Sequence, residues 1–129
     1  MTVMSSFPSV QGTPIEPKAL EAEPNTVYIA MLVSDGDNLL HTMIYMPYTI
    51  EESAAYGDVP VTWIINPAIV DLAPRVFTWY EQVMNEGGQE MGAMMGDGSP
   101  TTDRYSGFSF YCALTRHYLR QAGMHTLQQ

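Results

Sequence analysis

Three short apolar segments recur along the chain, and their spacing constrains the fold more than any other feature. They begin near residues 28, 59 and 90, which are 31 residues apart, and a stretch with helical periodicity follows each of them. A spacing of about 30 residues is the length of one strand-plus-helix unit. Alternating strands and helices predict a parallel sheet with right-handed crossovers. We therefore expect an α/β fold, a parallel sheet of three to four βα units that forms either half of a (β/α) barrel or an open doubly wound sheet.

The first strand is expected at residues 28–33, where the run YIAMLV is apolar without alternation and therefore typical of a strand buried on both faces. Further strands are expected at 59–65, at 90–95 and from residue 125. Apolar side chains spaced by three and four predict helices at 72–86 and 110–122, which end at Gly87 and Gly123. A shorter helix is expected from residue 39, and it should stop before Pro47 because the residue that precedes a proline avoids the helical region.

Residues 1–25 differ in composition from the rest of the chain. They contain four prolines among Ser, Gly and Glu and lack a sustained apolar period, which predicts an extended arm or linker ahead of one α/β domain at residues 26–129. The first residues lack the basic and apolar regions of a signal peptide. No apolar run approaches the roughly 18–20 residues of a membrane span. We therefore expect neither a visible secretion signal nor membrane insertion.

Charge and cysteine content exclude several classes of function. Five Lys and Arg against fourteen Asp and Glu give a formal net charge of −9, which argues against nucleic acid and anionic membranes as partners. The single cysteine, Cys112, rules out an internal disulfide and a multi-cysteine zinc site, and it is expected to be a small buried residue. The phosphate-binding patterns GxGxxG and GxxxxGK[ST] are absent. We expect no cofactor and no metal.

Three polar loops follow the expected strands, with the sequences SDGDN, INPA and GDGSPTTD. Because the carboxyl ends of parallel strands share one edge, these loops should gather where ligands bind in both candidate folds. Two neighbouring carboxyl groups can differ in protonation, one donating a proton while the other stays ionised, as glycoside hydrolysis requires. We hypothesise that Asp35 or Asp37 is a general acid and that Asp97 is a base or nucleophile. Alternatively, an aspartate caps the following helix and Gly36 makes the turn.

The third loop supplies further candidates by position alone. Four residues in or next to this loop are proposed to contact substrate: Ser99, Asp103, Arg104 and Tyr105. An aromatic ring such as that of Tyr105 can stack on a sugar. The alternating oxygens of this loop lack the later ligands of a calcium loop, so a solvated turn is favoured over a metal site. His41 is the only histidine close to the expected rim and is a minor candidate.

Three segments resemble the GxGYxYP family of putative glycoside hydrolases: VSDGDN (33–38), VPVTWIINPAIVDLAPRVFTWYEQ (59–82) and ALTRHYLRQAGMHT (113–126). They occur in the family's order, and the resemblance covers residues 27–127. Members are several times longer, and GDGSPTTDRYSGF stands here where they carry the naming motif. The resemblance implies a carbohydrate-related function and an extracellular or cell-surface location. It implies Asp35, Asp37, Asn38 and Asn66 as site residues, with Asn38 and Asn66 as substrate contacts.

Two main functional hypotheses follow. The first is a carbohydrate-active hydrolase that uses the rim carboxylates. The second is a non-catalytic, self-assembling or glycan-binding structural subunit, because half a barrel leaves sheet edges unpaired and a second copy could cover them. In that case the chain is a homo-oligomer, and the proline-rich arm could latch onto a neighbour. A truncated product without an independent role is a third alternative.

Overall fold

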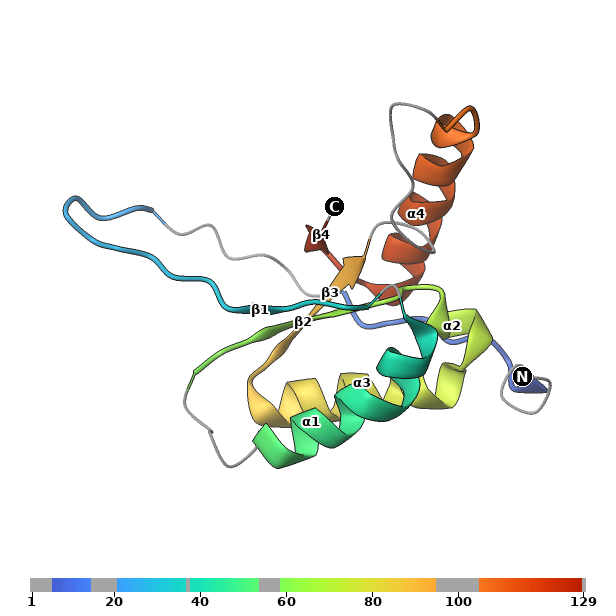
Figure 1. The fold of residues 1–129 in the computed structure, drawn as a ribbon, viewed down its shortest axis with the longest axis horizontal. Coiled ribbons are helices and arrows are strands. Elements are labelled where there is room, and N and C mark those ends of the chain that lie inside the picture. The colour runs from blue at the N-terminus through green and yellow to red at the C-terminus, as the bar shows by residue number, and fades with distance from the viewer. Residues whose placement is uncertain (1–5, 15–20, 37, 54–58, 95–104, 129) are drawn as a thin grey trace.

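Four parallel strands alternate with helices in the computed structural model of the chain, which describes residues 6–14, 21–36, 38–53, 59–94 and 105–128 (Figure 1). The strands are β1 (Leu32–Val33), β2 (Thr62–Ile65), β3 (Glu90–Met94) and β4 (Leu127–Gln128), and each pairs with its neighbour in sequence. A doubly wound sheet reverses its strand order at a switch point, whereas this order runs 1-2-3-4. The α/β prediction is confirmed, and of its two forms the structure is the half-barrel.

The helices begin and end close to the predicted residues, with one exception. They are α2 (Ile69–Leu72), α3 (Pro74–Gly87), α4 (Phe108–Ala122) and a first helical segment made of η2 (His41–Tyr45) and α1 (Met46–Ser53). Gly88 and Gly123 end α3 and α4 in the left-handed conformation. The expected stop before Pro47 is wrong, because η2 is a π-helical turn. Such a turn is wider than an α-helical one and makes room for the proline ring next to the preceding carbonyls.

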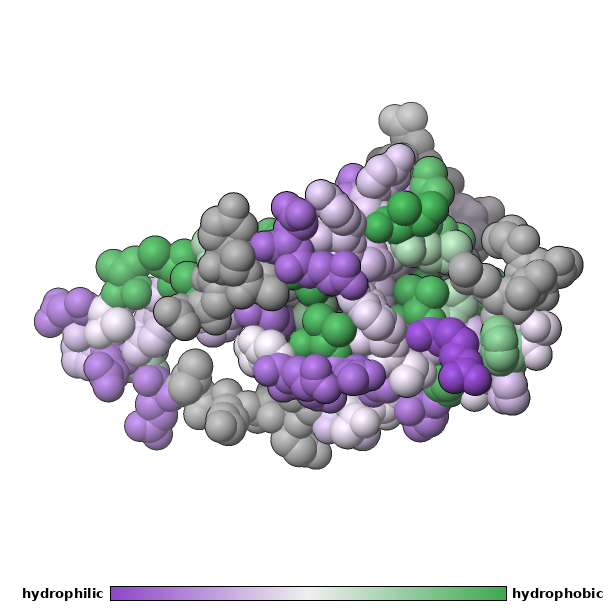
Figure 2. All heavy atoms as spheres, turned by 90° about the horizontal axis from the view of Figure 1, so that it is seen from below, coloured by the Kyte–Doolittle hydropathy of each residue, from purple (hydrophilic) through white to green (hydrophobic). Residues whose placement is uncertain are grey.

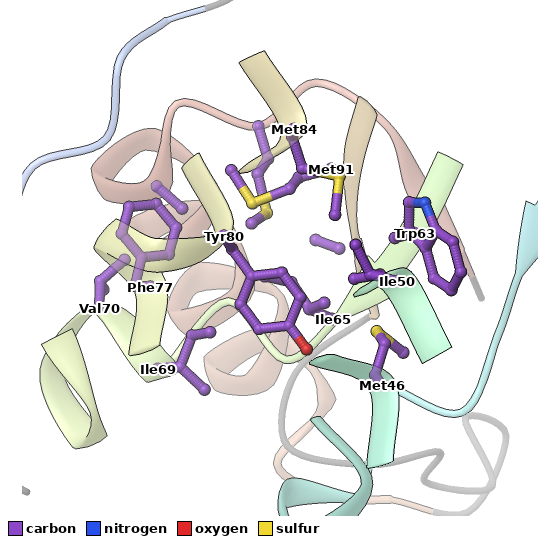
Figure 3. Close-up of a cluster of buried hydrophobic side chains, with 13 residues drawn as sticks. Met46, Ile50, Trp63, Ile65, Ile69, Val70, Phe77, Tyr80, Met84 and Met91 are labelled. Carbon is purple, nitrogen blue, oxygen red and sulfur yellow. The ribbon is translucent and has the colours of Figure 1, made fainter. Parts of the chain in front are cut away.

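The hydrophobic core lies between the outer face of the sheet and the helices (Figure 3). In Figure 3, Ile65 of β2 lies beside Tyr80 of α3, with Phe77 of α3 on one side of the cluster and with Trp63 of β2 and Met46 at the start of α1 on the other. All five side chains are buried. Successive side chains of a strand point to opposite faces, so Thr62 and Ile64 of β2 lie on the inner, concave face. The side chains of β2 therefore point alternately into the packed core on the outer face and toward the inside of the half-barrel.

The inner face of the sheet carries polar side chains that connect its strands. The Glu90 carboxylate of β3 accepts hydrogen bonds from the Thr62 hydroxyl at 3.0 Å and from the Thr126 hydroxyl at 2.8 Å. Near the other end of the strands, the Ser34 hydroxyl donates to Gln128 Oε1 at 3.0 Å. Ser34 follows β1 and Gln128 belongs to β4, the two edges of the sheet. A contact between them shows how strongly the sheet curls.

The prediction of a first strand at residues 28–33, buried on both faces, is wrong in length and in burial. Strand β1 contains Leu32 and Val33 only, and the apolar residues before it are exposed, with exposed fractions of 84% at Val27 and 81% at Ile29. Leu32 is in register with Thr62, the first residue of β2, so the preceding residues extend past the end of their neighbour. Figure 1 shows this segment projecting beyond the sheet. Its apolar side chains are exposed because most of it lies beyond the start of β2.

One described stretch of the N-terminal arm, residues 6–14, runs across its own domain. The Val10 amide donates to the Val70 carbonyl at 3.3 Å, and the Gly12 amide donates to the Gln121 carbonyl at 2.7 Å. A Cβ atom at Gly12 would lie 2.1 Å from the Ala122 carbonyl oxygen, so only glycine permits this approach. These contacts hold residues 6–14 against α2 and the end of α4.

Candidate functional site

The first polar loop leaves β1 with a strained backbone at Asp35. This residue has a φ of 86°, in the left-handed region that aspartate adopts uncommonly. Its carbonyl accepts the Asn38 amide at 3.2 Å, which closes the turn, and its side chain is exposed. Strained residues persist where the surrounding structure determines them, and they cluster at functional sites. Asp35 therefore presents a carboxylate at the carboxyl edge of the sheet from a defined backbone position.

Gly36 places this loop directly against β2. A Cβ atom at this position would lie 2.3 Å from the Ile64 carbonyl oxygen and 2.7 Å from the Ile65 Cα atom. Both are backbone atoms of the neighbouring strand, so the loop passes over the end of β2 where a side chain has no room. Gly36 lies inside the turn that the Asn38 amide closes. Its packing against β2 places the loop that carries Asp35 beside the end of that strand.

The helical segment after the loop holds it from the other side. Asn38 Oδ1 accepts the His41 amide at 3.1 Å, so Asn38 caps the helix. The Thr42 hydroxyl donates to the Gly36 carbonyl at 3.3 Å. The Tyr80 hydroxyl of α3 in turn donates to the Thr42 carbonyl at 2.5 Å. A chain of hydrogen bonds therefore connects the core to the loop that carries Asp35, and sequence reasoning did not identify Thr42 or Tyr80.

Replacing Tyr80 with phenylalanine is expected to destabilise the protein by about 1–2 kcal/mol at neutral pH, because the buried Thr42 carbonyl loses its donor. Burial raises the pKa of the Tyr80 hydroxyl well above its usual range. Below about pH 10 the unfolded chain keeps this proton, and the stabilisation is fully present. Above about pH 10 the unfolded chain releases the proton that the folded protein retains, so the free energy of unfolding falls.

Urea denaturation at pH 8 and at pH 10.5 measures this difference. The wild type should lose more stability over the interval than Tyr80→Phe does. Tyr48→Phe, at an exposed tyrosine, serves as the control and should behave as the wild type. Equal losses in all three proteins would show that Tyr80 does not couple folding to pH.

The second polar loop supplies a buried amide. Asn66 has an exposed fraction of 1%, and its Oδ1 accepts the Ala68 amide at 2.9 Å. Its carbonyl accepts the Ile69 amide at 3.2 Å, at the start of α2. Asn66 therefore shapes the turn after β2. Its predicted contact with substrate stays a prediction.

The third loop is represented in the structure by Tyr105. Its side chain has an exposed fraction of 45%, and its ring meets the Tyr111 ring edge-on with the centroids 6.1 Å apart. In Figure 1 the beginning of α4 stands apart from the loop that follows β1. The remaining candidates lie outside the described residues: Asp37, Asp97, Ser99, Asp103 and Arg104.

The minor candidates have ordinary surroundings. The His41 ring lies 6.3 Å from the Tyr45 ring on the same turn of η2. Cys112 is a free thiol, half-buried within α4. Among the residues that the structure describes, no group of three or more His, Cys, Asp or Glu side chains could hold a metal ion. A search of the same residues finds no helix long and apolar enough to span a membrane.

Comparison with known proteins gives one family and one structural relative. The family model of the GxGYxYP putative glycoside hydrolase C-terminal domain matches residues 25–129. The chain is also similar to the crystal structure of a putative hydrolase from Bacteroides thetaiotaomicron VPI-5482, with 26% sequence identity and a TM-score of 0.78. That match covers 94% of this chain and 24% of the relative, so the chain spans about a quarter of the relative's length. No curated protein matches the chain.

Proposed function

The chain belongs to the GxGYxYP putative glycoside hydrolase family, and from this premise we propose that it is a carbohydrate-active domain whose first-loop carboxylates act on a glycosidic bond. In this proposal Asp35 or Asp37 protonates the leaving oxygen, and Asp97 serves as base or nucleophile. The two roles require one carboxyl group that gives up a proton and one that remains ionised. Asn38, Tyr105 and the polar residues of the third loop, Ser99, Asp103 and Arg104, are the proposed substrate contacts.

The observation that carries this proposal is the backbone of Asp35. A left-handed φ at a residue with a side chain costs free energy, and glycine would avoid that cost. The loop is nevertheless held in this form by the close approach of Gly36 to β2 and by the bonds through Thr42. A carboxylate on such a support needs little reorganisation to meet a substrate, which favours catalysis. Asn66 contributes indirectly, because it shapes the adjoining loop.

Assay of the full chain against a broad panel of oligosaccharides and aryl glycosides tests the proposal. Release of reducing ends or of the aryl group is the expected result. A folded wild-type protein that leaves the whole panel intact would contradict it.

A second candidate function is a non-catalytic, self-assembling or glycan-binding structural subunit, and the exposed apolar segment before β1 favours it. The exposed residues are Val27, Tyr28, Ile29, Met31 and Leu32. Figure 2 shows hydrophobic residues gathered at this projecting end of the molecule. Strand β1 lies at one edge of the sheet and β4 at the other. Pairing of the segment before β1 with a second copy of the chain would cover this surface.

Light scattering at micromolar concentration tests the assembly. A dimer is the expected result, and Ile29→Asp should convert it to a monomer because the charge would lie in the pairing edge. Ile44→Asp is the matched control, since Ile44 is an exposed isoleucine on η2 with an exposed fraction of 54%. A monomeric wild type at all concentrations would rule out self-assembly through β1.

A further inference from the structure

A pocket of about 650 Å³ lies at the end of α4, away from the loops described above. Its walls come from Pro14 of the arm, from Arg116, Leu119 and Arg120 of α4, and from residues 123–125. These last residues precede β4, so the pocket is at the amino end of the strands. The first and second polar loops lie at the opposite edge. This pocket is therefore separate from the candidate active site.

The pocket concentrates cationic side chains in an acidic chain. Arg116 and Arg120 are two of only five Lys and Arg residues in the sequence, and His125 lies beside them. Among the residues that the structure describes, no carboxylate lines the pocket. Across the described residues, neither arginine forms an ion pair with a carboxylate. Arg116 and Arg120, one helical turn apart, thus both line the pocket, and no described carboxylate pairs with either guanidinium group.

The arm satisfies the helix carbonyls that would otherwise attract these cations and repel an anion. Gln11 Nε2 donates to the carbonyls of Arg120 at 3.0 Å and Gln121 at 2.8 Å, and the Gly12 amide adds a bond of 2.7 Å to Gln121. The Met124 amide caps the Leu119 carbonyl at 3.0 Å. Unpaired carbonyls give the C-terminal end of a helix its partial negative charge. Their pairing here reduces that charge at the pocket.

Glu81, which contacts the arm, and Asp71, which contacts α4, are both engaged outside the pocket. Glu81 Oε1 accepts the Thr13 amide at 2.7 Å. Asp71 Oδ1 accepts Gln121 Nε2 at 2.8 Å. Neither residue is part of the pocket wall. Among the described residues of the pocket wall, Arg116 and Arg120 are therefore the ones that carry a fixed charge.

We propose that this pocket binds an oxyanion, a carboxylate, sulfate or phosphate group, through Arg116 and Arg120. Guanidinium groups present several fixed donors that suit the paired oxygens of such groups. Pro14, Leu119 and Met124 supply an apolar surface for the body that carries the anion. The proposal does not depend on catalysis at the rim, because the two sites share no residue.

Titration of the full chain, followed by ¹H–¹⁵N NMR of the backbone and the arginine side chains, tests this proposal. The probes are glucuronate, inorganic sulfate, inorganic phosphate and, as a neutral control, glucose. Saturable shifts at Arg116 and Arg120 are expected with the anions and not with glucose. Arg116→Gln and Arg120→Gln should each weaken binding about three- to fivefold, and the double variant about tenfold, because each exposed cation contributes modestly. Both residues are exposed, so the variants should stay folded.

Arg75→Gln is the matched control. Arg75 lies over the Phe7 ring at 5.0 Å, outside this pocket, and its replacement should leave binding unchanged. Tighter binding of glucuronate than of the inorganic anions would identify an acidic sugar as the ligand class. Equal binding of all three would identify the charged group alone. Absent or non-saturable shifts, equal shifts with glucose, or undiminished binding by the double variant would overturn the proposal.

Discussion

Replacing Asp35 with asparagine is expected to lower kcat/KM on a glycoside substrate by about 10²- to 10⁴-fold while the protein remains folded. Asparagine has nearly the same shape as aspartate and also tolerates the left-handed conformation found at this position. It cannot donate or accept a proton as a carboxyl group does. The side chain of Asp35 is exposed, so the exchange leaves no buried group unsatisfied. Initial rates on a substrate that the wild type hydrolyses measure the effect.

Glu52→Gln is the matched control, because Glu52 is an exposed carboxylate near the C-terminal end of α1, which is separated from the first loop by the length of the helical segment η2 and α1. It should retain wild-type activity, and Asp37→Asn should share the loss. Asp35→Gly gives a further comparison. It should be inactive yet more stable by about 1 kcal/mol, because glycine relieves the backbone strain. Full turnover by Asp35→Asn would exclude this carboxylate from the chemistry.

Replacing Gly36 with alanine is expected to destabilise the protein by about 3 kcal/mol. The new methyl group would lie 2.3 Å from the Ile64 carbonyl oxygen, and relief would require movement of the β2 backbone. Domains of this kind are stable by about 5–15 kcal/mol, so the loss would be a large share of the total. The midpoint of urea denaturation measures it.

Gly87→Ala is the control for this substitution. A Cβ atom at Gly87, the last residue of α3, would meet only the flexible Gln89 Cγ at 3.6 Å. Alanine favours the helix there and should leave stability equal or raise it by about 0.5–1 kcal/mol. If Gly36→Ala unfolded at the same urea concentration as the wild type, the close contact with β2 would be refuted.

The repeat of strands and helices could be predicted from the sequence because it depends on local composition. Strands β2 and β3 lie in short, largely apolar runs, and the stripe of α3 ends at a glycine that adopts a left-handed conformation. The burial of β1 could not be predicted in this way, since a run such as residues 28–33 looks the same in a central strand and at an edge. Its exposure follows from the register of Leu32 with Thr62. Register is a tertiary property.

The site was predictable in part. The parallel strands bring the first and second polar loops to one edge, as their position after apolar runs indicated. The functions of the side chains there were harder to predict. The predicted contacts of Asn38 and Asn66 with substrate stay predictions, and the sequence did not indicate that each side chain also accepts a backbone amide near the start of a helix. Tyr80 lies in a helical apolar stripe, and nothing in its spacing distinguishes a residue that supports the rim from ordinary core.

The 1-2-3-4 order of the sheet has a consequence for how the protein is made. Every strand pairs with the strand that precedes it in the chain, so the earlier units can pair while later residues are still being synthesised. The bond from Ser34 to Gln128 joins residues 94 positions apart and must wait for the last of these units. Assembly on the ribosome would then proceed in the order of translation, with the curl of the sheet completed last.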